Sequence, residues 1–413
     1  MNDLFATNLP SRHRTGKVWN ILFRASTFIG IIVLAILLLT IVNNAFGYVA
    51  FEFRVDPDTL VTEDGTPLEE MNKDELVQVL QSNVSKGLFR NLEHQQPFEE
   101  RTWDDVYGLV LDRVVDPKIV GIWSVVDTIK LSKEEALAEV LDEHPDATIE
   151  FMSWLDVQFI KSPQSSDVIR AGIRTAIFGS LWTILVAVLV AFPIGVGGAI
   201  YLEEYAIDTP LNRFIRTNIY NLSGVPSIIY GMLGLAIFVR VLNKLTSGAV
   251  FGVVDPMNSN GRTILSAGLT LGLLILPMII INAQEAIKAV PNSLRLASFG
   301  LGGTRWQTIW HHVLPNALPG ILTGAILSIS RAFGETAPLV VVGASTFITL
   351  DPTGPFSKFT TLPIQIYQWT SRPQDEFRSI AAAAIIVLLI MLLSLNTTAI
   401  LLRNRFSRRN KLT

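Results

Sequence analysis

Six long apolar stretches divide the chain, and polar segments of very different length separate them. The first runs from Phe28 to about Phe46, close to the roughly 20 residues that a helix needs to cross a bilayer. The other five lie at about 176–200, 225–241, 264–282, 318–342 and 379–402. They are rich in Gly and Ala, which allow membrane helices to approach closely. The pattern predicts an all-α polytopic membrane protein with six transmembrane helices.

The segment between the first two apolar stretches, about residues 50–165, has the character of a soluble α/β domain. Asn72 with Glu75, and Ser132 with Glu135, have the spacing of capping boxes at the start of amphipathic helices. We expect a small core built from large side chains of this insert: Trp103, Tyr107, Leu111, Trp123, Phe151 and Trp154.

Charge is segregated along the chain rather than mixed. From Phe51 to Ile169 there are 26 acidic and 10 basic residues, whereas both ends of the chain are basic. Basic segments favour the cytoplasmic side of a membrane. We therefore predict a cytoplasmic N-terminus (1–27), a first span (28–49), an extracytoplasmic acidic insert (50–165), the main transmembrane domain (166–402) and a basic cytoplasmic tail (403–413).

The composition excludes several kinds of site. The chain has no cysteine, so disulfides, thiolate catalysis, Cys-ligated zinc and iron–sulfur clusters are excluded. Its five His residues show no metal-ligand spacing, and no phosphate-binding G-x-x-x-x-G-K-[ST] motif or recognisable Ser/His/Asp arrangement occurs. We expect no catalytic residue, no metal and no cofactor bound by this chain. Its basic residues lie at membrane boundaries, where they attract anionic lipid, and do not indicate nucleic-acid binding.

Two charged residues lie inside the fifth apolar stretch. A charged side chain at the centre of a bilayer costs about 2.5–3.5 kcal/mol on insertion scales and usually faces the interior of a helix bundle. Arg331 and Glu335 are four residues apart, so on a helix they share one face. They are either a structural ion pair or part of a pathway for a polar substrate.

The cytoplasmic segment 283–315 reads as a helix–turn–helix. Gly300, Gly302 and Gly303 form the turn, Arg305 and Trp306 follow it, and Leu314-Pro315 closes the segment. This compact piece either docks a partner or packs on the membrane surface.

Two of these features resemble a known family, the permease subunits of ABC importers, and specifically the A-type phosphate permease. The stretch Arg331–Leu339, RAFGETAPL, is similar to that family's signature. The family's docking loop, E-A-A-x3-G-x9-I-x-L-P, aligns with Leu296-Ala297-Ser298, Gly302 and His312–Pro315, with Leu296 replacing the Glu and His312 the Ile. Asn221–Gly231 and Leu362–Trp369 also resemble it.

The resemblance implies a type I ABC importer permease fold, in the plasma (inner) membrane, that moves phosphate by alternating access. It implies a heterodimer with a C-type permease, two ATPase subunits that bind ATP, and an extracytoplasmic phosphate-binding protein, so the chain itself is not expected to be an enzyme. It places Arg331, Glu335 and Thr336 on the substrate pathway. It also gives an ATPase-docking loop: Leu296, Ala297, Ser298, Gly302, Arg305, Trp306, Leu314 and Pro315.

Other interpretations stay open. The chain could be a permease for another oxyanion, such as molybdate or sulfate, or the C-type sister subunit. A membrane sensor would need a cytoplasmic signalling domain, and a membrane enzyme would need a nucleophile or metal cluster; neither is apparent in the sequence. The resemblance says nothing of the insert, which either contacts the binding protein or the sister subunit, or is a stabilising cover.

Overall fold

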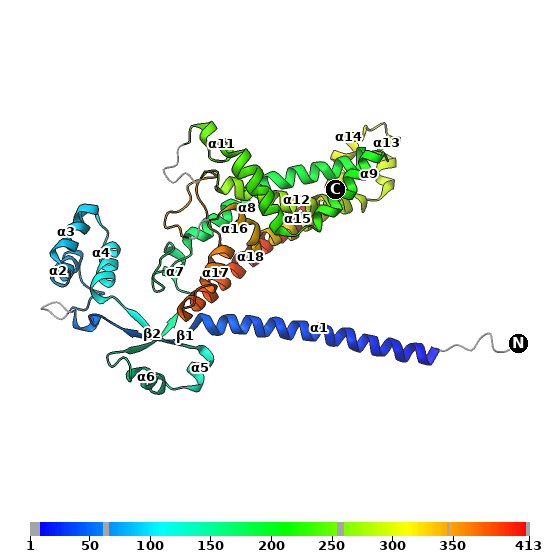
Figure 1. The fold of residues 1–413 in the computed structure, drawn as a ribbon. Coiled ribbons are helices and arrows are strands. Elements are labelled where there is room, and N and C mark those ends of the chain that lie inside the picture. Colours follow the sequence, from blue (N-terminus) through cyan, green and yellow to red (C-terminus); the bar gives the residue numbers. More distant parts are fainter. Residues whose placement is uncertain (1–8, 61–65, 254–259, 345–346, 410–413) are drawn as a thin grey trace. The chain divides into compact units, whose positions relative to one another are not determined.

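The computed structural model describes residues 9–60, 66–253, 260–344 and 347–409. The chain forms two compact units, Met1–Trp154 and Leu155–Thr413, which are described here one at a time (Figure 1). Residues 1–8 of the expected cytoplasmic N-terminus and Lys411 of the basic tail lie outside the described residues.

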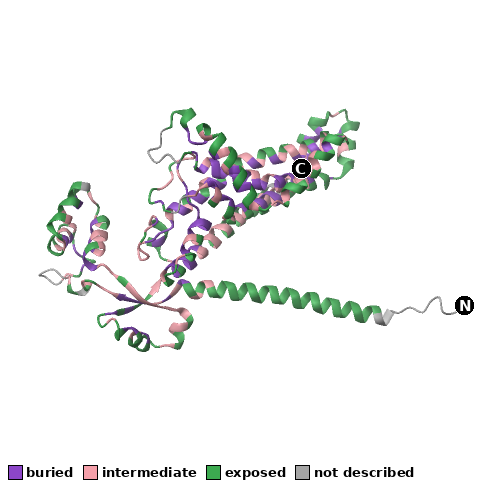
Figure 2. Ribbon diagram, in the orientation of Figure 1, coloured by how far each residue is buried: buried purple, intermediate pink, exposed green. Residues whose placement is uncertain are grey.

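The first unit begins with one long apolar helix, α1 (Leu9–Ala45). Its part from Arg12 to Ala45 is long and apolar enough to cross a membrane, and none of its most apolar window is buried by the rest of the protein. Figure 2 shows most of it exposed, whereas its last turn, which ends at the buried Ala45, packs on the rest of the unit. A helix satisfies all its backbone hydrogen bonds internally, so such a surface is suited to lipid.

Helix α1 leads directly into the central strand of a three-stranded antiparallel sheet, ordered β2-β1-β3. The strands are β1 (Phe46–Glu52), β2 (Lys118–Ser124) and β3 (Thr148–Ser153). Phe46 pairs with Ser153, and the Trp154 N–H donates to the Ala45 carbonyl (3.1 Å). The insert therefore begins and ends at neighbouring points beside the end of α1, as expected for a domain inserted after a span.

Helices fill the two connections of this sheet, which makes the insert an α/β domain. They are α2 (Lys73–Asn83), α3 (Lys86–Gln95), α4 (Trp103–Val110), α5 (Val125–Lys130) and α6 (Lys133–Leu141), with short turns η2 (Pro57–Thr59), η3 (Phe98–Glu100) and η4 (Leu111–Val115). The predicted capping boxes are confirmed: Asn72 with Glu75 begins α2, and Ser132 with Glu135 begins α6.

The expected core of the insert is confirmed only in part. The main core is mostly aliphatic and joins α2 to α4 through residues such as Leu76, Leu80 and Val106, and among the described residues its one buried ring is that of Phe98. Trp103, Tyr107 and Leu111 pack around it and are only partly buried. A smaller cluster lies under the sheet beside Trp123, which is also partly buried. Of the six expected side chains, Trp154 alone is buried, and Phe151 is 59% exposed. Ile149 shares a face of β3 with Phe151, but the cluster with α6 includes only Ile149.

The second unit is a helix bundle around α12 (Ile264–Lys288), which packs against α8 (Arg174–Ile200) and α15 (Leu314–Gly334) (Figure 1). Small residues make these contacts close: a Cβ on Gly268 would lie 2.6 Å from Val186, and one on Gly324 would lie 2.3 Å from Asn282. Helix α18 (Asp375–Arg409) packs on α15 and on α17 (Leu362–Thr370).

Shorter elements complete the second unit. They are α7 (Val157–Lys161), the π-helical turn η5 (Tyr201–Tyr205), α9 (Pro210–Ser223), α10 (Ser227–Gly234), the π-helical segment η6 (Leu235–Val241), α11 (Asn243–Thr246), η7 (Ala249–Phe251), α13 (Asn292–Gly300), α14 (Arg305–Thr308), the π-helical turn η8 (Ile309–Val313) and α16 (Ala337–Val342).

Within the described residues, five helices are long and apolar enough to cross a membrane, or six if one bent pair is a single span. That pair is α9 with α10–η6, bent by 106°. The stretch expected to span alone, Val225–Val241, holds only the eight residues of α10 and the seven of η6. At 1.5 Å per residue this is about 22 Å, short of the roughly 30 Å hydrocarbon core. Pro226 favours a break here because the residue before a proline disfavours helical geometry.

We predict that Thr102→Ala will destabilise the insert by about 1 kcal/mol, because Thr102 caps α4 and accepts from the Asp105 N–H. For a domain of about 100 residues this lowers the unfolding midpoint by about 4–8 °C, measurable by tryptophan fluorescence of the full chain. Ser82→Ala is the control, because Ser82 only bonds back to Gln78 within α2; an equal shift in both variants would contradict the capping role.

The same cap makes part of the insert's stability depend on pH. The hydroxyl and N–H of Thr102 donate to Asp105 and lower the pKa of that carboxyl below its ordinary 3.8. A lowered folded pKa adds stability above the ordinary value, and that stability is lost as pH falls through the folded pKa. The difference in unfolding free energy between wild type and Thr102→Ala should therefore become smaller below about pH 3.8.

Candidate functional site

The candidate site lies at a break between α15 and α16. The fifth apolar stretch was expected to be one span, 318–342, but α15 ends at Gly334 and α16 begins at Ala337. Between them Glu335 is extended (φ −76°, ψ 125°). Pro338 explains the break: it has no N–H to donate to the carbonyl of Gly334, and its ring would clash with that carbonyl in a continuous helix.

Arg331 and Glu335 face each other across this break. The Nε of Arg331 lies 3.2 Å from Oε1 of Glu335 and donates a hydrogen bond to it. The Arg331 side chain is 43% exposed and that of Glu335 is 17% exposed. The carboxylate is thus held by the fold, while much of the guanidinium surface remains open.

Two neighbouring helices complete the surroundings of Arg331. Its Nη1 lies 3.4 Å from the sulfur of Met278 on α12, a weak acceptor. On α10, which packs against the adjoining α16, the buried phenol of Tyr230 donates to the Leu222 carbonyl at the bend before α10 (2.7 Å). Among the described residues Nη2 has no hydrogen-bond partner, so one edge of the guanidinium remains available to a ligand.

Thr336, the third residue expected on the pathway, is the residue before α16. It is half-buried, and its hydroxyl does not cap the helix. Its carbonyl accepts from the N–H groups of Leu339 and Val340. Thr336 therefore lies next to the ion pair, with a side chain that the helix does not use.

Besides the docking loop, three stretches resemble the family, and the structure brings two of them, Asn221–Gly231 and Arg331–Leu339, together at this break. A Cβ added at Gly231 would lie 2.6 Å from Cα of Pro338, so α10 approaches the first turn of α16 at backbone contact. The third stretch forms α17, which packs instead on α18 and α8. Sequence alone gave no sign of the Met278 contact, which joins residues 53 positions apart.

The expected docking loop is a helical hairpin. Helix α13 ends at Gly300, Gly302 has a left-handed backbone (φ +83°), and a capping box of Thr304 with Gln307 starts α14. Buried Ser298 bonds Thr308 across the hairpin (Oγ–Oγ1 2.8 Å). The expected closure at Leu314-Pro315 is wrong: the helix continues from Arg305 to Gly334, and Pro315 lies inside it, directly after the π-helical turn η8. A local π-helical adjustment of this kind accommodates a proline within a membrane helix.

The outer face of this hairpin is apolar and exposed. Leu296 is 64%, Leu301 91% and Trp306 56% exposed, and Trp306 stacks on Trp310 with ring centroids 5.4 Å apart. Ala297, Gly302 and Arg305 are exposed beside them, whereas Leu314 and Pro315 are half-buried. Exposed apolar patches of this kind mark sites of association. We refer to Leu296, Leu301, Trp306 and Trp310 as the hairpin face.

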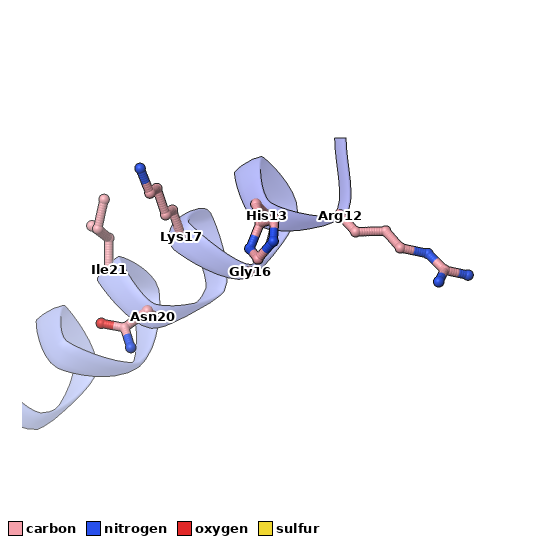
Figure 3. Close-up of a pocket in the computed structure, with 6 residues that line it drawn as sticks. All are labelled: Arg12, His13, Gly16, Lys17, Asn20 and Ile21. Carbon is pink, nitrogen blue, oxygen red and sulfur yellow. The ribbon is translucent and has the colours of Figure 1, made fainter. Parts of the chain in front are cut away.

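A hollow of about 370 Å³ lies on the first unit, along the start of α1 (Figure 3). Arg12, His13, Gly16, Lys17, Asn20 and Ile21 line it, all from one helix. Basic side chains at the end of an apolar helix extend toward lipid headgroups. This hollow therefore fits a membrane boundary better than a substrate site.

The family model for the "Binding-protein-dependent transport system inner membrane component" matches residues 191–412, more than half of the chain and all of the elements described above from the end of α8 onward. The chain belongs to this family. Its membership makes the second unit the inner-membrane component of a transport system.

Curated relatives agree with this assignment. A probable ABC transporter permease, YqgI of Bacillus subtilis, is 36% identical over 52% of this chain and 68% of its own length. The phosphate transport system permease PstA of Pasteurella multocida is 31% identical over 56% of this chain and 75% of its own length. PstA 1 of Mycobacterium tuberculosis strain H37Rv is 34% identical over 49% of this chain and 60% of its own length.

Among solved structures, the inward-facing MetNI methionine ABC transporter is 18% identical to the chain. It covers 57% of this chain and 95% of its own, with a TM-score of 0.41.

We predict that Gly231→Ala in this permease will displace α16, because the new Cβ would meet the backbone of Pro338. The thermal midpoint in detergent should fall, with a loss of about 1–3 kcal/mol from overpacking. Gly197→Ala is the matched control, since nothing lies within 4 Å of a Cβ on that helical glycine. Equal midpoints for the two variants would show that α10 and α16 are not in backbone contact.

Proposed function

We propose that this permease imports inorganic phosphate as one membrane subunit of an ABC importer. The observation that carries the proposal is Arg331, a permanent positive charge with a free edge at a break in a membrane helix. The names of the PstA relatives support phosphate as the substrate. The proposal concerns the whole transporter, of which this chain is one part.

Arg331 has the chemistry that phosphate recognition requires. A guanidinium is planar, is charged at every physiological pH, and matches two phosphate oxygens with parallel N–H donors. The Nη2 edge is open, and Nη1 gives up only a weak sulfur contact if it turns toward an anion. Phosphate can therefore bind Arg331 without first breaking the bond between Nε and Glu335.

Glu335 holds and moderates this charge. At 3.2 Å it fixes the position of the guanidinium and offsets the cost of placing Arg331 within the membrane. It also repels an approaching anion, which keeps phosphate binding weak enough for release. Thr336 lies next to the pair in sequence, and its hydroxyl, which does not cap α16, can donate to the same anion.

The same proposal requires partners. Transport alternates between outward and inward openings, each favoured by a different nucleotide state. ATP hydrolysis takes place on two separate ATPase subunits, a C-type permease completes the membrane path, and an extracytoplasmic protein delivers phosphate. The hairpin face supports docking on the ATPase. Leu296 stands where the family's loop has Glu, so we expect this contact to be mainly apolar.

Orientation follows from charge. The basic start of α1 and the basic end of α18 favour the cytoplasmic side, so both termini are cytoplasmic in this proposal. The insert, about 50–165, is then extracytoplasmic, on the side from which phosphate arrives.

We predict that Arg331→Ala will lower uptake of radiolabelled phosphate at least about 10-fold, because one charge-assisted hydrogen bond is worth about 1.5–3 kcal/mol. Uptake by Arg331→Lys should lie between those of wild type and Arg331→Ala, because lysine keeps the positive charge but lacks the two parallel N–H donors of the guanidinium. Arg378→Ala is the control: Arg378 is exposed and pairs with Asp375 at the start of α18. Near-normal uptake by Arg331→Ala, at normal expression, would refute the role. Uptake of radiolabelled molybdate or sulfate, but not of radiolabelled phosphate, by the wild-type transporter would contradict phosphate as the substrate.

We predict that Gly302→Trp will reduce co-purification of the ATPase, because a side chain at φ +83° strains the turn that shapes the hairpin face. The loss should be about 5-fold or more, from a strain of about 1–2 kcal/mol. Gly300→Ala is the control, since its Cβ would meet open space and its φ is helical. Full recovery of the ATPase with Gly302→Trp would argue against docking through this turn.

A further inference from the structure

Two adjacent carboxylates are held nearly out of solvent at the end of span α8. Glu203 and Glu204 lie in the π-helical turn η5, and their side chains are 18% and 11% exposed. Like charges so close and so buried are unfavourable unless each has its own partners. Each carboxylate does have them, on different helices.

Glu204 binds the side chain that closes the turn between α12 and the hairpin. Arg295, on α13, donates to Oε1 of Glu204 from Nε (3.1 Å) and from Nη2 (2.7 Å). Its Nη2 and Nη1 also donate to the carbonyls of Ile287 (3.0 Å) and Val290 (2.7 Å), at the end of α12. The guanidinium is 14% exposed and thus joins α8, α12 and α13 at one point.

Glu203 extends the same junction to a fourth helix. Its Oε1 accepts from Nη1 of Arg216 on α9 (3.2 Å) and from Nε2 of Gln284 on α12 (3.1 Å). Arg216 also donates to the Leu202 carbonyl. Gln284 is 4% exposed, so this contact too is inside the fold.

We infer that the Arg295–Glu204 pair is the positioning joint that transmits movement of the hairpin to spans α8 and α12. The inference rests on the proposed function, since it assigns the route by which an ATPase bound at the hairpin acts on the membrane helices. Arg295 is absent from the hairpin face, and its role here is to fix α13, not to touch the partner.

The geometry of the pair suits transmission better than stability. A buried ion pair often adds little net stability compared with apolar residues of the same size, but it admits few alternative arrangements. A guanidinium fixed by one carboxylate and two carbonyls cannot slide or rotate without losing several bonds at once. The π-helical turn that presents Glu204 is also of a kind often found at functional sites.

Three variants separate the parts of this joint. Glu204→Gln keeps the shape and removes the charge, Arg295→Lys keeps the charge and removes the fork, and the exchange Arg295→Glu with Glu204→Arg restores opposite charges. Arg213→Gln is the matched control, because the Arg213–Asp208 pair belongs to the same region but its side chains are 67% and 80% exposed.

The first arm uses the purified full chain alone and measures hydrogen–deuterium exchange over residues 292–300. Exchange in Glu204→Gln and Arg295→Lys should rise about 10-fold, from the loss of charge-assisted hydrogen bonds. Arg213→Gln should match wild type. Unchanged exchange in both joint variants would overturn the inference without reference to any ATPase.

The second arm uses the complex with its ATPase, sister permease and binding protein in vesicles. Phosphate taken up per ATP hydrolysed should fall about 10-fold, within the usual range of coupling between sites, while co-purification and basal ATP hydrolysis remain at the wild-type level. The charge exchange should recover part of the coupling. The inference would be overturned if Glu204→Gln and Arg295→Lys couple transport to ATP hydrolysis normally. It would also be overturned if these variants fail to assemble and the double variant with exchanged charges does not restore assembly. If the wild-type complex hydrolyses ATP but moves no phosphate, the proposed substrate is wrong. The hydrogen–deuterium exchange measured on the chain alone then decides whether the Arg295–Glu204 pair fixes α13.

Discussion

A bilayer tolerates neither an unpaired charge nor an unsatisfied backbone group, and the second unit depends on how it meets that constraint near Arg331. The helix that carries Arg331 ends three residues later, at Gly334. The backbone of Pro338 itself lies against α10, where Gly231 has no side chain to hold it away. The break is therefore packed against protein on one side and open on the other, and the charge beside it is paired with Glu335 at 3.2 Å. Close packing, backbone irregularity and charge compensation occur together at one place.

Much of this could be predicted because it depends on local sequence. Most of the apolar stretches predict the spans by length, although Val225–Val241 does not span alone, and the two predicted capping boxes of the insert follow from a four-residue pattern. The proximity of Arg331 and Glu335 follows from their spacing, although the helix between them ends. Pro338 was present in the sequence as a signal for that break, since its ring excludes a continuous helix four residues earlier.

The contacts that could not be predicted join distant parts of the chain. Arg295 and Glu204 are 91 residues apart, and Arg331 and Met278 are 53 apart, with no pattern in either segment that points to the other. The prediction of the insert core was only partly right, for another reason. Large aromatic residues were expected to be buried by size alone, but helices α2 and α4 present aliphatic faces to each other and leave the rings at the edge.

Helix α12 connects the two charged centres. Met278 contacts Arg331, and Gln284, six residues further along the same helix, contacts Glu203. At 1.5 Å per residue these contacts are about 9 Å apart along the axis, with an unbroken helix between them. Pro277 lies inside α12 beside Met278, a position where a helix bends most readily. A shift of the hairpin that moves the end of α12 through Arg295 would therefore reach the sulfur that borders Arg331. Helix α12 is thus a short physical route from the hairpin to the anion site that we propose at Arg331.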